Sequence, residues 1–234
     1  MRKLAPLGLV AVMILAAVGL TPRNEASAQG TAGLVSSIVS RMERNHRTLK
    51  SLRAGINMVK YNSQIRDEDK YSGVVVYQAG VGRNANVRVE WQSPRREILA
   101  VSNGEYTLYN PRQGTAFVGN ARSSKQGKVS GLLDLINLSG SQLQARFEPL
   151  QDIREETLWG GVHTFHLKLV PKGNAGYRYA EIWVDDGGMP VQSKIVEKND
   201  DSTTVRLLNV ERNARVSGDD FRLQLDPGVK RIRG

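Results

Sequence analysis

The side chains that could do chemistry in this chain are few and scattered. The sequence has three histidines, His46, His163 and His166, and no cysteine. His163 and His166 lie three residues apart in a segment that alternates like a β-strand, so their side chains are predicted to point to opposite faces. Ligands on opposite faces cannot hold one metal ion. The pattern predicts no metal site, and the lack of cysteine excludes disulfides, thiolate ligands and a lipidated N-terminal cysteine.

Three acidic pairs are the other candidates for catalysis: Asp185-Asp186, Asp200-Asp201 and Asp219-Asp220. Each lies where a turn is expected, and Asp favours turns for its own hydrogen bonding. Carboxylates that hydrolyse a glycoside would have to face each other across a cleft, and this spacing does not place them so. The segment GVGRNA at residues 80–85 imitates a dinucleotide fingerprint, but no helix pattern follows it. No Walker motif or nucleophile elbow is present, so we predict a protein without catalytic residues or cofactors.

The N-terminus has the pattern of an export signal. Arg2 and Lys3 precede an apolar stretch over residues 4–20, and the small residues Ala26-Ser27-Ala28 form a cleavage site before Gln29. This pattern predicts removal of residues 1–28 and a periplasmic domain over residues 29–234. An uncleaved anchor is the alternative, because the apolar stretch is only slightly short of a membrane span.

The chain is basic, with 33 Lys and Arg against 23 Asp and Glu and a net charge of +10. Residues 1–28 carry three of those cations and one anion, which leaves a mature charge of +8. Such a surplus attracts nucleic acid, anionic headgroups or an acidic partner. Export makes nucleic acid the least expected of these, and plain solubility is the other explanation.

Hydrophobic spacing predicts the elements that must position these residues. Leu34, Ile38, Met42 and Leu49 recur at helical spacing, and from about residue 53 the period changes to two. Leu132, Leu135 and Ile136 lie in a short apolar segment that ends at Gly140 and suits a second helix. Strands are predicted near residues 53–62, 71–79, 85–92, 96–102, 105–110, 114–119, 145–152, 161–170, 177–185, 190–197 and 203–211, with a last extended piece near 221–225.

These elements predict an α+β, mostly β fold: one large curled antiparallel sheet of about eleven strands, with the helices filling its hollow. No linker or repeat divides the chain. Strand alternation places two sets of apolar side chains on the inner face, beneath the helices. The members of these sets are Val87, Val89, Trp91, Phe165, Leu167 and Leu169.

Several short motifs occur in a characteristic order along the chain. They are VRVEW at 87–91, EILAVSNGEYTLYNP at 97–111, LLDLINLSG at 132–140, GGVHTFHLKLVPK at 160–172 and DDFRLQLDPGVKRI at 219–232. This series resembles the periplasmic outer-membrane lipoprotein carrier proteins, the LolA family, over essentially the whole mature chain. The resemblance implies an unclosed β-barrel whose apolar cavity, under a lid of helices, shields the acyl chains of lipoproteins.

The resemblance also implies partners and lid residues. The expected partners are acylated lipoproteins, an inner-membrane lipoprotein-releasing ABC transporter and an outer-membrane lipoprotein acceptor, with the carrier itself a monomer. Arg83 matches a family arginine associated with the lid, which here would include Leu132, Leu135 and Ile136. The residue after it is Asn84 where the family usually has Pro, so a solvated hairpin arginine stays the alternative. A lipid-binding or envelope-sensing module with another hydrophobic ligand is the alternative function.

Overall fold

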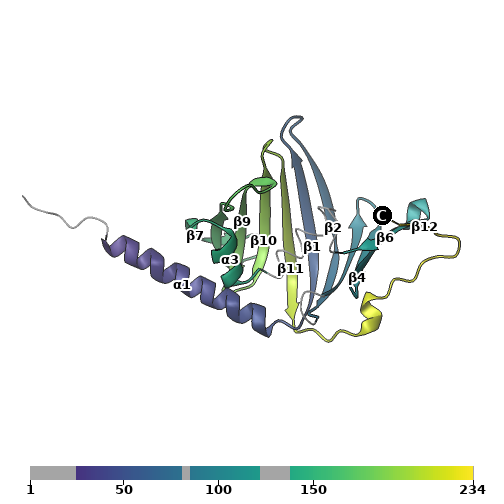
Figure 1. Cartoon of the computed structure of the whole chain (residues 1–234), viewed down its shortest axis with the longest axis horizontal. Helices are drawn as coiled ribbons and strands as arrows, with labels where there is room; N and C mark the ends of the chain where they lie inside the picture. The colour runs from purple at the N-terminus through teal and green to yellow at the C-terminus, as the bar shows by residue number, and fades with distance from the viewer. Residues whose placement is uncertain (1–24, 81–84, 122–137, 234) are drawn as a thin grey trace, which may run out of the picture.

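Figure 1 shows a computed structural model of the chain, which describes residues 25–80, 85–121 and 138–233. Helix α1 leads into two runs of strands that flank the short helix α3. The elements are α1 (Glu25–Thr48), β1 (Ser51–Asn62), β2 (Asp67–Gln78), β3 (Asn86–Ser93), β4 (Glu97–Ser102), β5 (Glu105–Asn110), η1 (Pro111–Gln113), β6 (Thr115–Asn120), α3 (Gly140–Arg146), β7 (Gln151–Leu158), β8 (Val162–Leu169), β9 (Tyr177–Asp185), β10 (Pro190–Glu197), β11 (Ser202–Arg212), η2 (Gly218–Phe221) and β12 (Lys230–Arg233).

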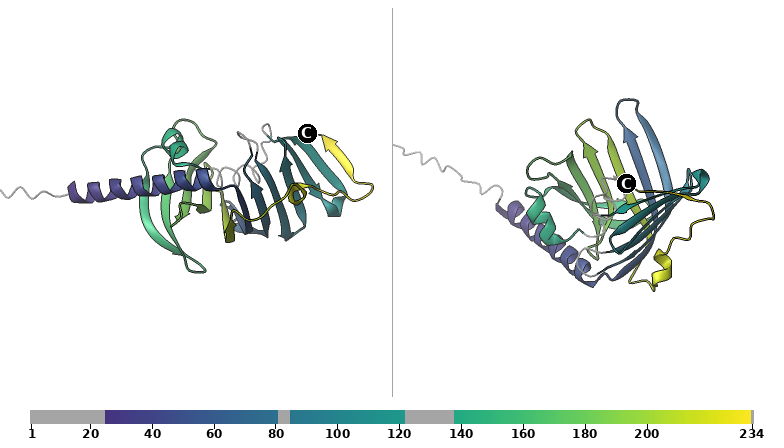
Figure 2. Two further views of the ribbon diagram at one scale, coloured as in Figure 1. Left: turned by 90° about the horizontal axis from the view of Figure 1, so that it is seen from below. Right: turned by 45° about the vertical axis from the view of Figure 1, so that its right-hand side comes forward.

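All the described strands form one sheet in the order β12-β6-β5-β4-β3-β2-β1-β11-β10-β9-β8-β7. The sheet curls without closing, and β12 and β7 are its two edges (Figure 2). This confirms the predicted mostly β fold with a single curled sheet. The sheet has twelve strands rather than about eleven, because β12 pairs in parallel with β6. The extended piece predicted near 221–225 is not a strand: η2 ends at Phe221, and the chain pairs only from Lys230 onward.

The segment between β6 and β8 differs most from the predicted elements. A strand was predicted over 145–152, but α3 occupies 140–146 and β7 begins only at Gln151. The Ser139 hydroxyl accepts a hydrogen bond from the Gln142 N–H, and the Gln142 side chain reaches back to the Ser139 N–H. This reciprocal capping box starts a helix at Gly140, where the predicted apolar helix was expected to end, and the helix continues into the first two residues of the predicted strand.

Helix α1 packs on the inner face of the sheet with α3 beside it, while its N-terminal part extends past the sheet (Figure 1). Ile38 and Met42 are fully buried in a cluster formed with β8 and β9. Two glycines allow this close approach. A Cβ atom at Gly140 would lie 2.6 Å from the Val39 carbonyl oxygen, and one at Gly188 would overlap the backbone of Arg41. The helix is therefore held between α3 and the β9–β10 turn.

The C-terminal segment after β11 crosses the outer face of the sheet. Ile98, Tyr109 and Ala116 form a small buried cluster on that face, which Leu223 and Leu225 help to cover. Polar contacts also hold this segment against the sheet. Arg53 bonds Asp220 at 2.6 Å and Arg88 donates to the Arg222 carbonyl at 3.2 Å. The segment thus carries the chain across to β6, where β12 forms.

Gly73 marks an irregularity in the ladder between β2 and β3. The register shifts between Ser72 and Gly73, so the two strands approach closely there. A Cβ atom at Gly73 would overlap the Glu90 carbonyl and lie 2.9 Å from the Trp91 Cα. Backbone atoms cannot move aside as a flexible side chain can, so this position requires glycine.

We expect Gly73→Ala to lower the free energy of unfolding by about 1–3 kcal/mol, the usual effect of overpacking. Denaturant unfolding followed by circular dichroism measures the change. Gly176→Ala is the matched control, because no atom lies within 4 Å of the Cβ it adds. A Gly73→Ala protein as stable as the Gly176→Ala protein would show that the β2–β3 ladder tolerates a side chain at this point.

Candidate functional site

The six apolar residues predicted to line the inner face do lie on one face of the sheet. Successive pairs in the ladders connect the two sets across the intervening strands: Leu167 with Ile182, Ile182 with Ser193, Ser193 with Val205, Val205 with Met58 and Met58 with Tyr71. From there the same face continues through Val75 to Val89. Residues that are direct partners in a ladder point to the same side, so the apolar face is continuous.

The two sets nevertheless belong to different clusters. Phe165, Leu167 and Leu169 pack with Ile38 and Met42, so they form the core beneath α1. The other cluster contains Val87, Val89 and Trp91 together with buried residues of β1, β2, β4, β5 and β11 and a few from β7, β9 and β10. The structure therefore brings each set together separately, and residues of α1 are buried in the cluster of the first set.

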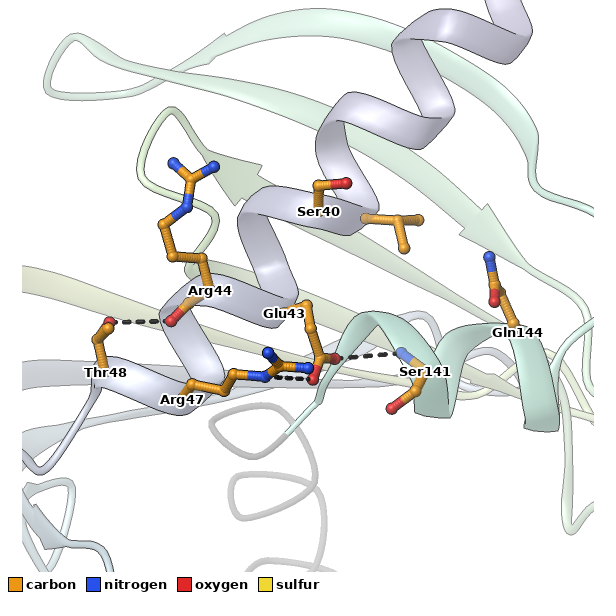
Figure 3. A pocket seen from close by; sticks show the side chains of 8 residues that line it. Ser40, Glu43, Arg44, Arg47, Thr48, Ser141 and Gln144 are labelled. Carbon is orange, nitrogen blue, oxygen red and sulfur yellow. Dashed lines mark hydrogen bonds and ion pairs between the residues drawn. The ribbon is translucent and has the colours of Figure 1, made fainter.

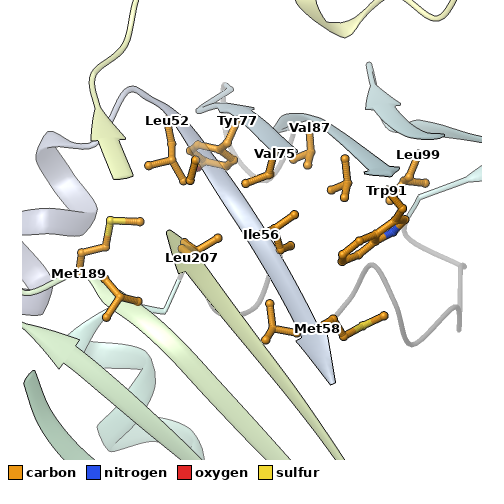
Figure 4. Packing of buried hydrophobic residues seen from close by; sticks show 14 of the residues in the cluster. Leu52, Ile56, Met58, Val75, Tyr77, Val87, Trp91, Leu99, Met189 and Leu207 are labelled. Atoms are coloured by element: carbon orange, nitrogen blue, oxygen red, sulfur yellow. The ribbon is translucent and has the colours of Figure 1, made fainter. Parts of the chain in front are cut away.

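Figure 4 shows the cluster of the second set. It combines rigid β-branched side chains with flexible ones, since Met58 and Met189 are buried in it. Trp91 retains only 3% of its exposure and meets Tyr71 edge to face at 5.9 Å. Burial raises the pKa of the Tyr77 phenol, which keeps this hydroxyl uncharged. The surface is apolar, uncharged and partly adaptable, which suits a hydrocarbon ligand.

The lid residues predicted from the resemblance lie outside the described part of the chain. Arg83 falls in the segment 81–84, and Leu132, Leu135 and Ile136 fall in 122–137. Leu138, the last apolar residue of that predicted helix, is described and is buried in the cluster under α1. The role of these four residues stays a prediction.

A groove of about 590 Å³ between α1 and α3 was not predicted from the sequence. Figure 3 shows Glu43 at its centre, where it accepts hydrogen bonds from the Arg47 guanidinium at 3.2 Å and the Ser141 N–H at 3.4 Å. Partial desolvation works against ionisation, but these hydrogen bonds prevail and lower the pKa of Glu43. The contact between the helices is therefore strongest with Glu43 ionised and weakens as the pH falls through its lowered pKa. The i,i+4 spacing of Glu43 and Arg47 and the Ser139 capping box were the available sequence signals.

The histidines of β8 take up opposite faces, as predicted. His163 meets the Phe165 ring at 5.4 Å, whereas His166 stacks on Trp183 at 4.3 Å on the outer face. A hydrogen bond with Asp186 is the main cause that raises the pKa of His163, and Glu155 adds to it. His166 lies 3.1 Å from a Glu181 carboxylate oxygen. These are ion-pair and packing contacts of the β7–β10 region.

Metal clusters and membrane-spanning helices are two further classes of site that residues 25–80, 85–121 and 138–233 could contain. No group of three or more His, Cys, Asp or Glu side chains there is placed to hold a metal ion. None of the described helices is both long and apolar enough to cross a membrane.

Solved structures share the fold at low sequence identity. The MucA/MucB complex from Pseudomonas aeruginosa contains a chain with a TM-score of 0.51 and 14% identity, and the alignment covers 81% of this chain but only 61% of that one. An uncharacterized conserved protein from Thermus thermophilus gives a TM-score of 0.51 at 13% identity, covering 89% of this chain and 99% of that one. The protein thus spans less than two thirds of the MucB-complex chain. At these identities the likeness concerns the fold alone.

No curated protein sequence matches the chain. The family model described as outer membrane lipoprotein carrier protein LolA, however, matches residues 80–224. The match begins just before β3 and continues through η2 into the C-terminal segment, so it includes both sets of inner-face residues. The chain therefore belongs to the LolA family of outer membrane lipoprotein carrier proteins.

Proposed function

We propose that this protein carries lipoproteins between the inner and outer membranes and shields their acyl chains on its apolar inner face. The observation that carries the proposal is the continuous apolar face of an unclosed sheet in a chain of the LolA family. Exposed hydrocarbon costs about 25 cal/mol per Å² in water, so an acylated lipoprotein requires such a surface to leave a membrane. Binding of this kind needs no catalytic group or cofactor.

Within this face we assign acyl-chain contact to Val87, Val89 and Trp91. Their cluster contains the flexible Met58 and is separate from the cluster in which Ile38 and Met42 of α1 are buried. Phe165, Leu167 and Leu169 line the same face but already pack with α1, so an acyl chain reaches them only when α1 is displaced. The near-complete burial of Trp91 implies that cargo must separate packed side chains, which makes the empty, closed state a competitor of the loaded state.

The proposal includes a location and two membrane partners. Residues 1–28 act as a cleaved export signal, and 29–234 form the periplasmic carrier domain. An inner-membrane ABC transporter loads the carrier, and an outer-membrane acceptor unloads it. The alternative is a lipid-binding or envelope-sensing module that uses the same face for another hydrophobic ligand.

The three tryptophans provide a direct test of where acyl chains bind. Trp91 lies on the inner face and Trp159 in an exposed hairpin turn. Trp183 is buried in the same cluster as Trp91, but its pairing with His166 directs its ring to the other face of the sheet. In a Trp159→Phe/Trp183→Phe protein, brominated acyl chains should strongly quench the remaining fluorescence of Trp91. In the matched Trp91→Phe protein, which keeps the other two, the same ligand should quench little. Stronger quenching in the second protein would place the ligand elsewhere.

Cargo class is tested with a triacylated lipoprotein and the same polypeptide without its lipid. We expect the purified mature protein to hold only the acylated form in solution, because burial of hydrocarbon supplies the binding free energy. Pull-down measures this, and mass spectrometry of organic extracts identifies any bound lipid. Retention of a free lipid with no retention of lipoprotein would favour the alternative function.

Substitution of Arg83 tests its proposed role in the lid. Its guanidinium donors would hold the closed state, so Arg83→Leu should accept lipoprotein at least as well as the unmodified protein but deliver it more slowly. A charge-assisted contact of this kind is worth about 1.5–3 kcal/mol, which corresponds to a tenfold or greater shift between states. Transfer from loaded carrier to acceptor is followed over time. Equal transfer rates would make Arg83 a solvated hairpin residue.

A further inference from the structure

Exposed cations gather at one end of the sheet, on neighbouring turns. The β3–β4 turn lies beside the β5–β6 turn because Trp91 pairs with Glu97 and Ile98 pairs with Tyr109. Lys230, which begins β12, pairs with Thr115 at the start of β6. We call the cations of these turns and of β12 the basic rim. Its members, all exposed, are Arg95, Arg96, Arg112, Lys230, Arg231 and Arg233.

Few carboxylates lie within the basic rim itself, although the start of β2 at the same end of the sheet carries the exposed Asp67, Glu68 and Asp69. No Asp or Glu occurs in residues 106–120 or 227–234. Glu90 is shared between Arg88 at 3.2 Å and Arg96 at 2.8 Å, so one anion faces two cations. Asp226 accepts a hydrogen bond from the Tyr109 hydroxyl, and Glu97 is half-buried at the start of β4. The rim therefore keeps a net positive charge that faces solvent.

Protection of a sheet edge explains only part of this pattern. Lys and Arg on an edge strand discourage pairing with other chains, and β12 is an edge. Arg95, Arg96 and Arg112 lie on turns, where no strand edge needs protection. An acidic strand added to β12 would pair with only the stretch Lys230–Arg233 and would leave the turn cations unused. A broad anionic surface, in contrast, meets the turns and the strand start together.

We propose that the basic rim docks the protein on the anionic phospholipid headgroups of a bilayer. Lys and Arg beside an anionic membrane each strengthen binding about fivefold, so a few of them give weak and reversible attachment. Because these charges are exposed, added salt should weaken the attachment. The inference rests on the placement of charge and does not depend on which cargo the inner face binds.

Vesicle co-sedimentation of the full mature chain tests the proposal. The probes are vesicles of mixed phosphatidylglycerol and phosphatidylcholine, with pure phosphatidylcholine vesicles and soluble polyglutamate for comparison. The rim variant is Arg112→Glu/Lys230→Glu/Arg231→Glu. The control variant is Arg146→Glu/Lys172→Glu/Lys198→Glu, which alters exposed cations of α3, the β8–β9 loop and the β10–β11 turn. Both variants change the net charge equally, so they separate placement of charge from total charge.

We expect the unmodified protein to bind the phosphatidylglycerol vesicles in low salt and to bind pure phosphatidylcholine vesicles little. The rim variant should lose more than about a hundredfold in vesicle affinity, and the control variant much less. Melting curves verify that each variant is folded. If the rim variant does not fold, an Arg112→Gln/Lys230→Gln/Arg231→Gln protein takes its place, and its expected loss of vesicle affinity is smaller. Any of three outcomes would overturn the proposal. They are equal losses of affinity in the rim and control variants, no binding of the unmodified protein to phosphatidylglycerol vesicles, and binding to polyglutamate alone. Each outcome is independent of lipoprotein capture.

Discussion

The structure depends on covering one continuous apolar face of a sheet that does not close. Ladder pairing holds that face together from β8 to β3, and water must be kept from all of it. A single helix is too narrow to cover so many strands. Helix α1 fills the hollow over β8 and β9, where Ile38 and Met42 are fully buried. The cluster that includes β1–β4 is built separately, so one apolar face contains two distinct packed regions.

The polar groups of the described chain mainly fix geometry around this face. Glu43 links α1 to α3, and Arg53 and Arg88 tie the C-terminal segment to the outer face. Glycines take the positions of closest approach, with Gly140 and Gly188 against α1. Recognition by burial of hydrocarbon is non-directional and roughly proportional to area, so it tolerates cargoes that share acyl chains but differ in sequence.

Strand periodicity predicted most of the sheet because each inner-face residue alternates with a more exposed one. Val87, Val89 and Trp91 are buried as their alternation implied, and the turns at Asp185 and Asp200 join the strands expected. Local hydrogen bonding that competes with this period was harder to predict. The Ser139–Gln142 capping box begins α3 at Gly140, where a predicted helix was expected to end, and the four-residue β12 pairs with β6 without a strand pattern of its own. Short strands without their own hydrophobic pattern depend on the partner that they meet.

The sequence by itself determined which side chains are apolar, which face of each strand they occupy and that the histidines of β8 point apart, because these follow from a two-residue period. Only the tertiary structure decided how distant strands combine. It placed Leu167 under α1 and Val89 in another cluster, although both lie on one face. It also gathered Arg95, Arg112 and Lys230 at one end of the sheet. Those groupings depend on ladder order and on the curl of the sheet, which arise from contacts between residues far apart in the chain.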